Sequence, residues 1–301
     1  KEYHKDSWDK NCQIEVSMSN IIEKYVKKKE YLVCVDSDGC AMDTMDVKHF
    51  RCFGPCMIRE WKLEQWKEET EKRWNDVNLY TMTRGINRFK ALEAVLRWVD
   101  GHVCKIEGLE DLAKWTDTAK ELSPANLMAA IEAGGGDILK KAFDWSAAVN
   151  REIDALPESE KLPFEGVKET LAMIHEKADI VVVSSANAQA VAEEWQTHGL
   201  AGHTELMLSQ DAGSKQFCIN ELLKKGYQTD HVLMVGDAPG DRSAARNNGV
   251  LYYPILVKKE TYSWKRLQEE GMNRFLTGTF KGEYERQLEQ EFEDNLTPKT
   301  E

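Results

Sequence analysis

The chain has 301 residues, of which 42% are hydrophobic, enough for one large domain or two of medium size. Its net charge of −12 argues against a general nucleic-acid-binding protein, whose binding surface is usually basic. There is no long apolar run and no signal-peptide pattern, so we expect a cytoplasmic protein without a membrane partner. The seven cysteines follow no zinc-binding spacing and fit reduced, intracellular thiols.

The first part of the chain leads to a short apolar strand. Residues 1–16 are polar and predict an N-terminal extension, and residues 17–29 predict a short helix. The strand at 31–36 runs directly into two carboxylates, Asp36 and Asp38, followed by a glycine. In open α/β sheets ligands bind beyond the carboxyl ends of strands, so these carboxylates could hold a divalent cation or act as nucleophile and proton carrier. An ordinary junction between a strand and a turn is the alternative.

The middle of the chain, residues 45–163, shows helical periodicity and no convincing strand. Phe89 to Val99 form a one-sided apolar stripe, typical of a helix packed on a core. Ser123 and Pro124 are a natural helix cap and first residue, and the glycines at 134–136 separate two further helices. We therefore predict an all-helical module inserted after the first strand.

Strands and helices alternate from Pro163 onward, which predicts right-handed crossovers and a parallel, Rossmann-like α/β sheet flanked by helices. The predicted strands of this part are 179–183, 205–208, 231–235 and 250–256. The predicted domains are a core of 17–44 and 164–280, the inserted module 45–163, the extension 1–16 and a charged helical tail 281–301.

Three of the predicted strands end in polar residues, and a parallel sheet brings these ends to one edge. The residues with reactive or ligating groups at this edge are Asp36, Asp38, Ser184, Lys215, Asp237 and Asp241. Four carboxylates cannot remain ionised together without a cation, and an oxygen-only set suits Mg²⁺. A hydroxyl, a lysine and helix N-termini suit phosphoryl oxygens. Each residue alone is more often a cap or a turn, but together they predict a phosphoryl-transfer site.

These residues resemble the motifs of the haloacid dehalogenase superfamily of hydrolases. The first motif is similar to Asp36–Cys40, although Cys40 departs from the commonest residue there. The second is similar to Ile180–Ser184, the third to Lys215 and the fourth to Gly236–Asp241. The helical module falls where the family inserts its helical C1-type cap.

The resemblance implies a covalent mechanism in which Asp36 attacks phosphorus and forms an aspartyl-phosphate. Asp38 would protonate the leaving oxygen and then deprotonate the attacking water. The implied Mg²⁺ ligands are Asp36, Asp38 through its backbone carbonyl, Asp237 and Asp241. The implied phosphate-binding residues are Ser184, Ser185 and Lys215.

The resemblance also limits the substrate, because the second carboxylate, Asp38, is typical of phosphate-ester chemistry rather than of cleavage at C–halogen or C–P bonds. We expect a small-molecule phosphate monoester. Arg84 and Arg88 could meet an anionic substrate, although a solvated helix face is the simpler interpretation. His49 resembles the β-phosphoglucomutase-like branch only after a one-residue shift. A phosphomutase and a catalytically silent binding protein of the same fold remain the alternatives.

Overall fold

The structure is a computed structural model that describes residues 21–297. The predicted extension 1–16 and the start of the helix predicted at 17–29 lie outside the described residues. The described chain forms two compact units. The α/β unit contains residues 21–43 and Lys161–Asn295, and the helical unit contains Thr44–Glu160. The helical unit is thus inserted between two parts of the α/β unit.

Within the described residues, the α/β unit contains a five-stranded parallel sheet of order β3-β2-β1-β4-β5. Its strands are β1 (Tyr31–Val35), β2 (Ala178–Val183), β3 (Leu206–Leu208), β4 (Val232–Gly236) and β5 (Leu251–Pro254). Val35 at the end of β1 pairs with Val182 on one side and Val235 on the other, so the three central strands end nearly level. This confirms the predicted fold class.

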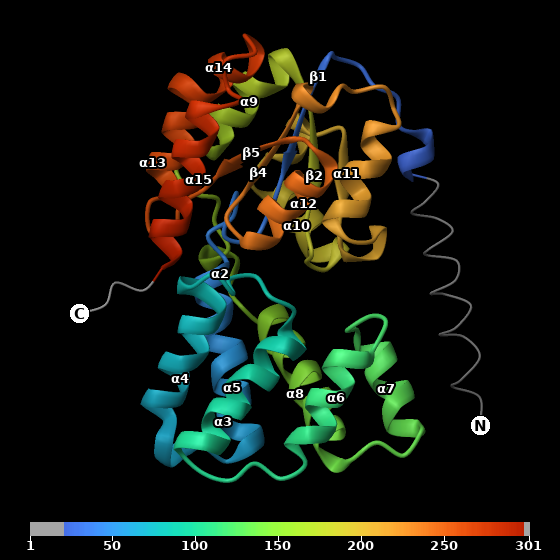
Figure 1. The fold of residues 1–301 in the computed structure, drawn as a ribbon, viewed down its shortest axis with the longest axis vertical. Helices are drawn as coiled ribbons and strands as arrows, with labels where there is room; N and C mark the ends of the chain where they lie inside the picture. Colours follow the sequence, from blue (N-terminus) through green and yellow to red (C-terminus); the bar gives the residue numbers. More distant parts are fainter. Residues whose placement is uncertain (1–20, 298–301) are drawn as a thin grey trace. The chain divides into compact units, whose positions relative to one another are not determined.

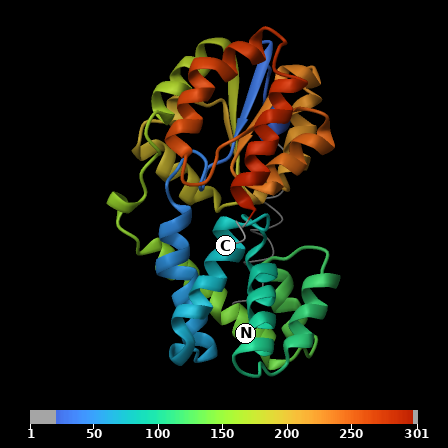
Figure 2. The same cartoon turned by 60° about the vertical axis from the view of Figure 1, so that its left-hand side comes forward.

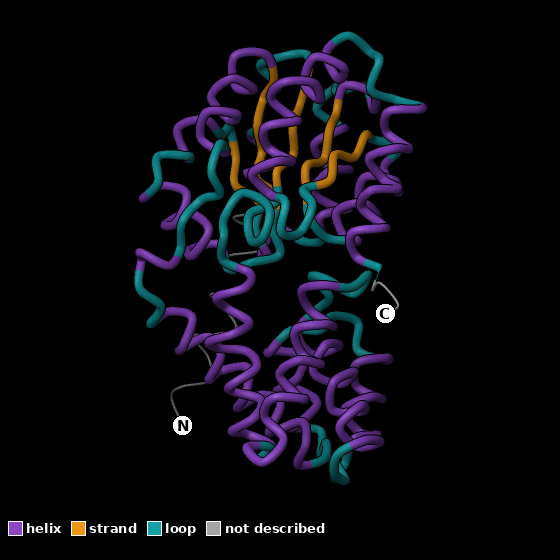
Figure 3. Tube along the Cα trace, turned by 90° about the vertical axis from the view of Figure 1, so that its left-hand side faces the viewer, coloured by secondary structure: helices purple, strands orange, loops and turns teal. Residues whose placement is uncertain are grey.

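Helices cover both faces of this sheet (Figures 1 and 3). They are α9 (Val167–Lys177), α10 (Ala188–Thr197), α11 (Lys215–Leu223), α12 (Pro239–Asn248), α13 (Glu260–Arg266), α14 (Met272–Leu276) and α15 (Glu283–Leu296), with the π-helical turn η8 (Leu267–Gly271) and the 3-10 turns η5 (Ala201–His203), η6 (Gln210–Ala212) and η7 (Thr229–His231). All six residues of β2 are buried, as expected for a β-branched strand enclosed on both faces.

In the described part of the segment before β1, residues 21–24 are helical and residues 25–30 are not, whereas the sequence predicts helix to residue 29. The buried carboxylate of Asp179 explains the difference. It accepts hydrogen bonds from the backbone N–H groups of Lys28 (2.9 Å) and Lys29 (3.0 Å) and from the hydroxyl of Tyr25 (3.1 Å). These bonds use backbone donors that a continued helix would have used itself.

The last helix, α15, lies in the part of the chain predicted as a charged helical tail, 281–301, and packs into the α/β unit. Leu288 and Phe292 are buried, and Glu293 pairs with Arg242 of α12 (2.6 Å). Asn295 exchanges two hydrogen bonds with the backbone of Val257, just after edge strand β5. α15 therefore covers the β5 side of the sheet, where backbone groups would otherwise lack partners.

The helical unit is a bundle with no strand in Thr44–Glu160 (Figure 2). Its helices are α2 (Met45–Lys48), α3 (Gly54–Trp61), α4 (Lys67–Asn75), α5 (Arg88–His102), α6 (Leu109–Thr118), α7 (Pro124–Glu132) and α8 (Asp137–Asp154), with the π-helical segments η1 (His49–Phe53) and η3 (Asp76–Tyr80) and the 3-10 turns η2 (Glu64–Trp66) and η4 (Glu158–Glu160). Trp74 and Trp145 are fully buried at its centre, edge to face at 5.7 Å. Ser123 caps α7 as predicted, accepting a hydrogen bond from the Asn126 N–H.

No helix among residues 21–297 is long and apolar enough to cross a membrane.

Candidate active site

Asp36 lies directly after β1, where the strand emerges from the sheet. Its N–H still pairs with the Val235 carbonyl of β4 (3.0 Å), so the backbone is fixed at this point. One carboxylate oxygen accepts the Ser37 N–H (2.8 Å), and the other lies 2.8 Å from the ammonium of Lys215. The side chain is buried, and each of its two oxygens has a partner that fixes its orientation.

Asp237 lies in the turn that follows β4, and Asp241 is the third residue of α12. Asp241 is fully buried, and one of its oxygens accepts the Ala238 N–H (3.0 Å), which satisfies a free donor at the start of α12. The turn also depends on Gly236, because a Cβ there would overlap the carboxyl group of Asp241. Glycine at this position therefore lets Asp241 fold back against the end of β4.

Lys215 is the first residue of α11, whose N-cap Ser214 accepts the Phe217 N–H with its side chain (3.2 Å). Its ammonium lies between Asp36 (2.8 Å) and Asp241 (2.6 Å). Burial alone would lower the pKa of Lys215, but the carboxylates of Asp241 and Asp36 outweigh it and hold that pKa above its usual range. Lys215 is therefore a fixed positive charge that links the ends of two strands.

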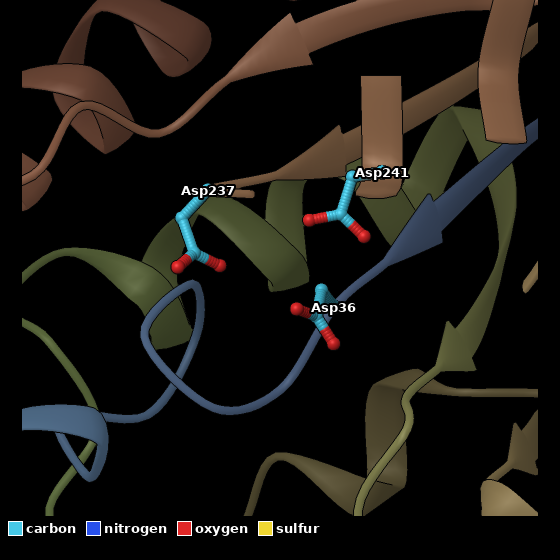
Figure 4. A group of neighbouring side chains, drawn as sticks. All are labelled: Asp36, Asp237 and Asp241. Carbon is cyan, nitrogen blue, oxygen red and sulfur yellow. The ribbon is translucent and has the colours of Figure 1, made fainter. Parts of the chain in front are cut away.

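Asp36, Asp237 and Asp241 form a group of three buried carboxylates, each with an oxygen within 4.8 Å of the others (Figure 4). Burial raises the pKa of Asp36 well above its usual range; Lys215 opposes this, and the carboxylates of Asp241 and Asp237 reinforce it. Three carboxylates against one ammonium leave an excess of negative charge that a divalent cation would balance. Buried carboxylate oxygens are donors that suit Mg²⁺. We call these three residues with Lys215 the carboxylate site.

Asp38 lies two residues beyond Asp36 and is half-buried. The chain turns at Gly39, whose φ of 79° lies in the left-handed region that favours glycine. A hydrogen bond from the Gly39 N–H to the Met42 carbonyl (2.8 Å) closes the turn. Both predicted catalytic aspartates thus belong to one compact loop, residues 36–42.

Two buried tryptophans hold this loop. The indole N–H of Trp195 in α10 donates to the Ser37 hydroxyl (2.9 Å), and that of Trp264 in α13 donates to the Cys40 carbonyl (2.8 Å). Sequence reasoning missed both residues. Their helical spacing marks them only as core residues, and nothing in the sequence indicates where an indole N–H points.

Ser184 and Ser185 follow β2 at the same edge of the sheet. Ser184 is buried, and its hydroxyl accepts the Ala186 N–H (3.1 Å). This is the strand-end cap that such a serine commonly forms. Ser185 is exposed.

The predicted substrate residues Arg84, Arg88 and His49 all belong to the helical unit. His49 is buried, and its Nδ1 accepts the indole N–H of Trp74 (2.9 Å). Arg84 is buried and donates to a backbone carbonyl of η3 (2.9 Å). Arg88 donates to the Asn150 side chain (2.7 Å), and burial lowers the pKa of Arg88 to about 10.

The family model of haloacid dehalogenase-like hydrolases matches residues 100–253, about half of the chain. The chain belongs to the haloacid dehalogenase-like hydrolases. This confirms the resemblance inferred from the motifs and identifies the protein as an enzyme of that family. The matched range contains Lys215 and Asp241, whereas Asp36 and Asp38 precede it. The folded chain brings Asp36 from outside that range into contact with Lys215.

Several solved structures resemble this chain at low sequence identity. A protein assigned as a phosphoglycolate phosphatase, from Lactobacillus delbrueckii subsp. bulgaricus, is 15% identical, with a TM-score of 0.48, over 75% of this chain and 85% of the other. One assigned as a β-phosphoglucomutase, from Thermotoga maritima, is 15% identical, with a TM-score of 0.44, over 74% and 84%. A haloacid dehalogenase-like family protein from Streptococcus pneumoniae is 9% identical, with a TM-score of 0.44, over 78% and 90%. No curated protein sequence matches the chain.

Proposed function

We propose that this hydrolase is a Mg²⁺-dependent phosphatase that cleaves a small-molecule phosphate monoester through an aspartyl-phosphate on Asp36. The observation that carries the proposal is the buried carboxylate site. Lys215 contacts both Asp36 (2.8 Å) and Asp241 (2.6 Å), and Asp237 completes the group of carboxylates. A site with this charge and these donors suits a divalent cation together with a phosphoryl group.

The donor set fits Mg²⁺, because three buried carboxylates lie close together. We propose that the ion is held by Asp36, Asp237 and Asp241, with Asp241 binding directly or through water, and by the backbone carbonyl of Asp38. When bound, Mg²⁺ would shield the approach of an anionic nucleophile to an anionic phosphate and neutralise developing charge. In this proposal the protein's own side chains carry out the nucleophilic attack and the proton transfers.

In the first step a carboxylate oxygen of Asp36 attacks phosphorus. A bond forms between this oxygen and phosphorus, and the bond between phosphorus and the ester oxygen breaks, with its electron pair leaving on that oxygen. Asp38 donates a proton to the leaving oxygen. In the second step Asp38 accepts a proton from water, the water oxygen bonds to phosphorus, and the bond to Asp36 breaks to release inorganic phosphate.

The other residues bind and orient the phosphoryl group in this proposal. Lys215 would contact a phosphoryl oxygen while restraining Asp36, its ammonium being already fixed by Asp36 and Asp241. Ser184 and Ser185 would donate hydroxyl or backbone hydrogen bonds at the end of β2. Arg84, Arg88 and His49 are proposed to recognise the rest of the substrate, with the helical unit acting as the cap.

The test is a screen for phosphate release from sugar phosphates, nucleotides and phosphorylated acids with Mg²⁺. We expect release from a subset of these esters by the wild type and none by Asp36→Asn, whose amide cannot form the acyl phosphate. Equal rates for the two proteins would remove Asp36 as the nucleophile. Conversion of a sugar phosphate without phosphate release would indicate a phosphomutase. No turnover of any ester would indicate a binding protein.

A further inference from the structure

Tyr252 of β5 is a fully buried residue that reaches the end of the neighbouring strand β4. Its hydroxyl donates to the carbonyl of Gly236 (3.0 Å), the last residue of β4. The same carbonyl accepts the Ile255 N–H (2.9 Å). Two donors from the β5 segment therefore fix the peptide group that precedes Asp237.

This peptide group determines how the chain enters the turn of residues 236–241, which joins β4 to the first residues of α12 and carries Asp237 and Asp241. The turn has little freedom, because Asp241 accepts the Ala238 N–H (3.0 Å) and lies where a Cβ on Gly236 would be. A rotation of the Gly236 peptide would move Asp237 relative to Asp241. The carboxylate site therefore depends on the orientation of a carbonyl that belongs to none of its own residues.

The terminal helix α15 supports the ring of Tyr252. Phe292 packs edge to face against this ring, with centroids 5.6 Å apart. The guanidinium of Arg242, the residue after Asp241, lies over Phe292 at 5.2 Å and pairs with Glu293 (2.6 Å). α15 thus contacts both the residue that fixes the start of the turn and the residue that follows its end.

We propose that Tyr252 is a positioning residue of the carboxylate site, whose hydroxyl, supported by α15, fixes the Gly236 carbonyl and so the direction in which Asp237 leaves β4. Tyr252 acts through the backbone and touches no reacting atom. The part of this inference that concerns Mg²⁺ and turnover rests on the proposed function, whereas the part that concerns the turn does not.

The test compares Tyr252→Phe with Tyr253→Phe. Tyr253 is the next residue of β5 and is equally buried, and its hydroxyl donates to the Ser263 carbonyl of α13 (2.7 Å), away from the turn. Each substitution removes one buried hydroxyl that donates to a backbone carbonyl. The Tyr253 hydroxyl also accepts the Nε–H of Arg266 (3.1 Å), so Tyr253→Phe should lose at least as much stability as Tyr252→Phe. Any effect at the carboxylate site should appear in Tyr252→Phe alone.

Two measurements do not require activity. Hydrogen–deuterium exchange should become faster over 236–241 in Tyr252→Phe and remain unchanged there in Tyr253→Phe. Calorimetric titration with Mg²⁺ should show about fivefold weaker binding for Tyr252→Phe, as expected for the loss of one buried hydrogen bond, and no change for Tyr253→Phe. On any ester that the wild type hydrolyses, Tyr252→Phe should lower kcat with little change in KM at saturating Mg²⁺, because Tyr252 does not contact substrate.

The inference is overturned if both variants behave alike, or if exchange over 236–241 rises without weaker Mg²⁺ binding. A wild type that binds no Mg²⁺ would overturn the proposed function and the part of this inference that concerns Mg²⁺, and exchange over 236–241 would then decide the part that concerns the turn. A wild type that binds Mg²⁺ but releases phosphate from no ester would refute the proposed function alone, because exchange and titration would still decide the role of Tyr252.

Discussion

At the scale of single residues, the positive charge of Lys215 balances only part of the negative charge of the carboxylates around it. Its ammonium contacts Asp36 and Asp241, and Asp237 lies in the same group of carboxylates. Buried ion pairs contribute little net stability, but removal of one partner is costly because the other charge remains buried and uncompensated. The arrangement is therefore better explained by the binding of a cation and an anion than by stability of the fold.

We expect Lys215→Met to lower the free energy of unfolding by about 3 kcal/mol without Mg²⁺, since two buried carboxylates then face each other with no ammonium between them. Saturating Mg²⁺ should restore part of this loss. Turnover should fall at least about a hundredfold, as expected when a fixed electrostatic contact to the reacting group is lost. Urea unfolding with and without Mg²⁺, together with the phosphate assay, measures both effects.

The matched control is Lys177→Met, which removes the same charge at the exposed end of α9. It should change stability by less than about 0.5 kcal/mol. A stability loss in Lys215→Met that does not depend on Mg²⁺ would contradict the proposed role of the ammonium.

A second prediction separates Asp38, the proposed proton carrier, from Asp237, whose side chain is a proposed ligand of the metal. Asp38→Asn should lose turnover while it keeps nearly normal Mg²⁺ affinity, because the proposed contact to the ion is its backbone carbonyl. Asp237→Asn should lose both, since its buried side chain is a proposed ligand. Calorimetric Mg²⁺ titration of the two variants measures this difference. A large loss of affinity in Asp38→Asn would mean that its side chain binds the ion.

The residues of the carboxylate site were predictable from their positions in the sequence. The aspartates come shortly after a recognisable apolar strand, and Lys215 begins a helix that has a serine cap. Asp36 and Asp237 lie directly after β1 and β4, and Lys215 follows Ser214. Tyr252 and Trp264 were not predictable as parts of its support. A buried aromatic residue gives the same sequence pattern whichever acceptor its polar atom reaches.

At the scale of elements, the loop 36–42 is held from two helices, since Trp195 belongs to α10 and Trp264 to α13. A loop that carries both the proposed nucleophile and the proposed proton carrier needs a fixed shape, because catalysis depends on the mutual placement of these groups. These indole hydrogen bonds, together with the burial of Cys40, Ala41 and Met42 in the hydrophobic core, explain how this seven-residue loop keeps its shape.

We expect Trp264→Phe to weaken Mg²⁺ binding and lower kcat, each by about fivefold, because the Cys40 carbonyl loses its indole donor and the loop becomes less fixed. The matched control is Trp145→Phe. Trp145 is also fully buried and donates to a backbone carbonyl, that of Phe53 (3.2 Å), but within the helical unit. It should destabilise the protein to a similar degree and leave Mg²⁺ affinity unchanged. Equal Mg²⁺ affinities for the two variants would show that the loop does not depend on Trp264.

Most elements, α15 among them, followed from periodicity and caps, whereas the packing partners of α15 did not. The helix is strongly charged, and its buried residues, such as Leu288 and Phe292, form only a narrow stripe one side chain wide. Such a stripe is also found on peripheral helices, so the sequence alone suggests a tail. The contacts of α15 with β5 and α12 depend on pairs distant in sequence, such as Arg242 with Glu293.

At the scale of the whole molecule, the sheet is assembled across the inserted helical unit. β1 pairs with β2 and β4, although residues 44–160 separate it from both in sequence. The alternation of strands and helices made this sheet predictable, because parallel strands with right-handed crossovers allow few arrangements. The substrate was not predictable, because the helices of the insertion carry only packing patterns and no strand end that would mark a binding residue.

The last prediction concerns the stability of the folded protein as a function of Mg²⁺. The carboxylate site exists only when β1, β4 and α11 are assembled, so the ion should bind the folded chain and not the unfolded one. At a free Mg²⁺ concentration of about one hundred times Kd, mass action adds about 2.7 kcal/mol to the free energy of unfolding. For a chain of this size we expect a rise in Tm of about 4 °C, reversed by EDTA. Scanning calorimetry of the wild type, of Asp237→Asn and of Asp230→Asn measures this rise in Tm.

Asp230 is exposed before β4 and carries the same charge as Asp237, so Asp230→Asn is the matched control. It should keep the full shift in Tm, whereas Asp237→Asn should lose most of it. If the wild type and Asp237→Asn respond equally to Mg²⁺, the ion binds elsewhere on this acidic chain.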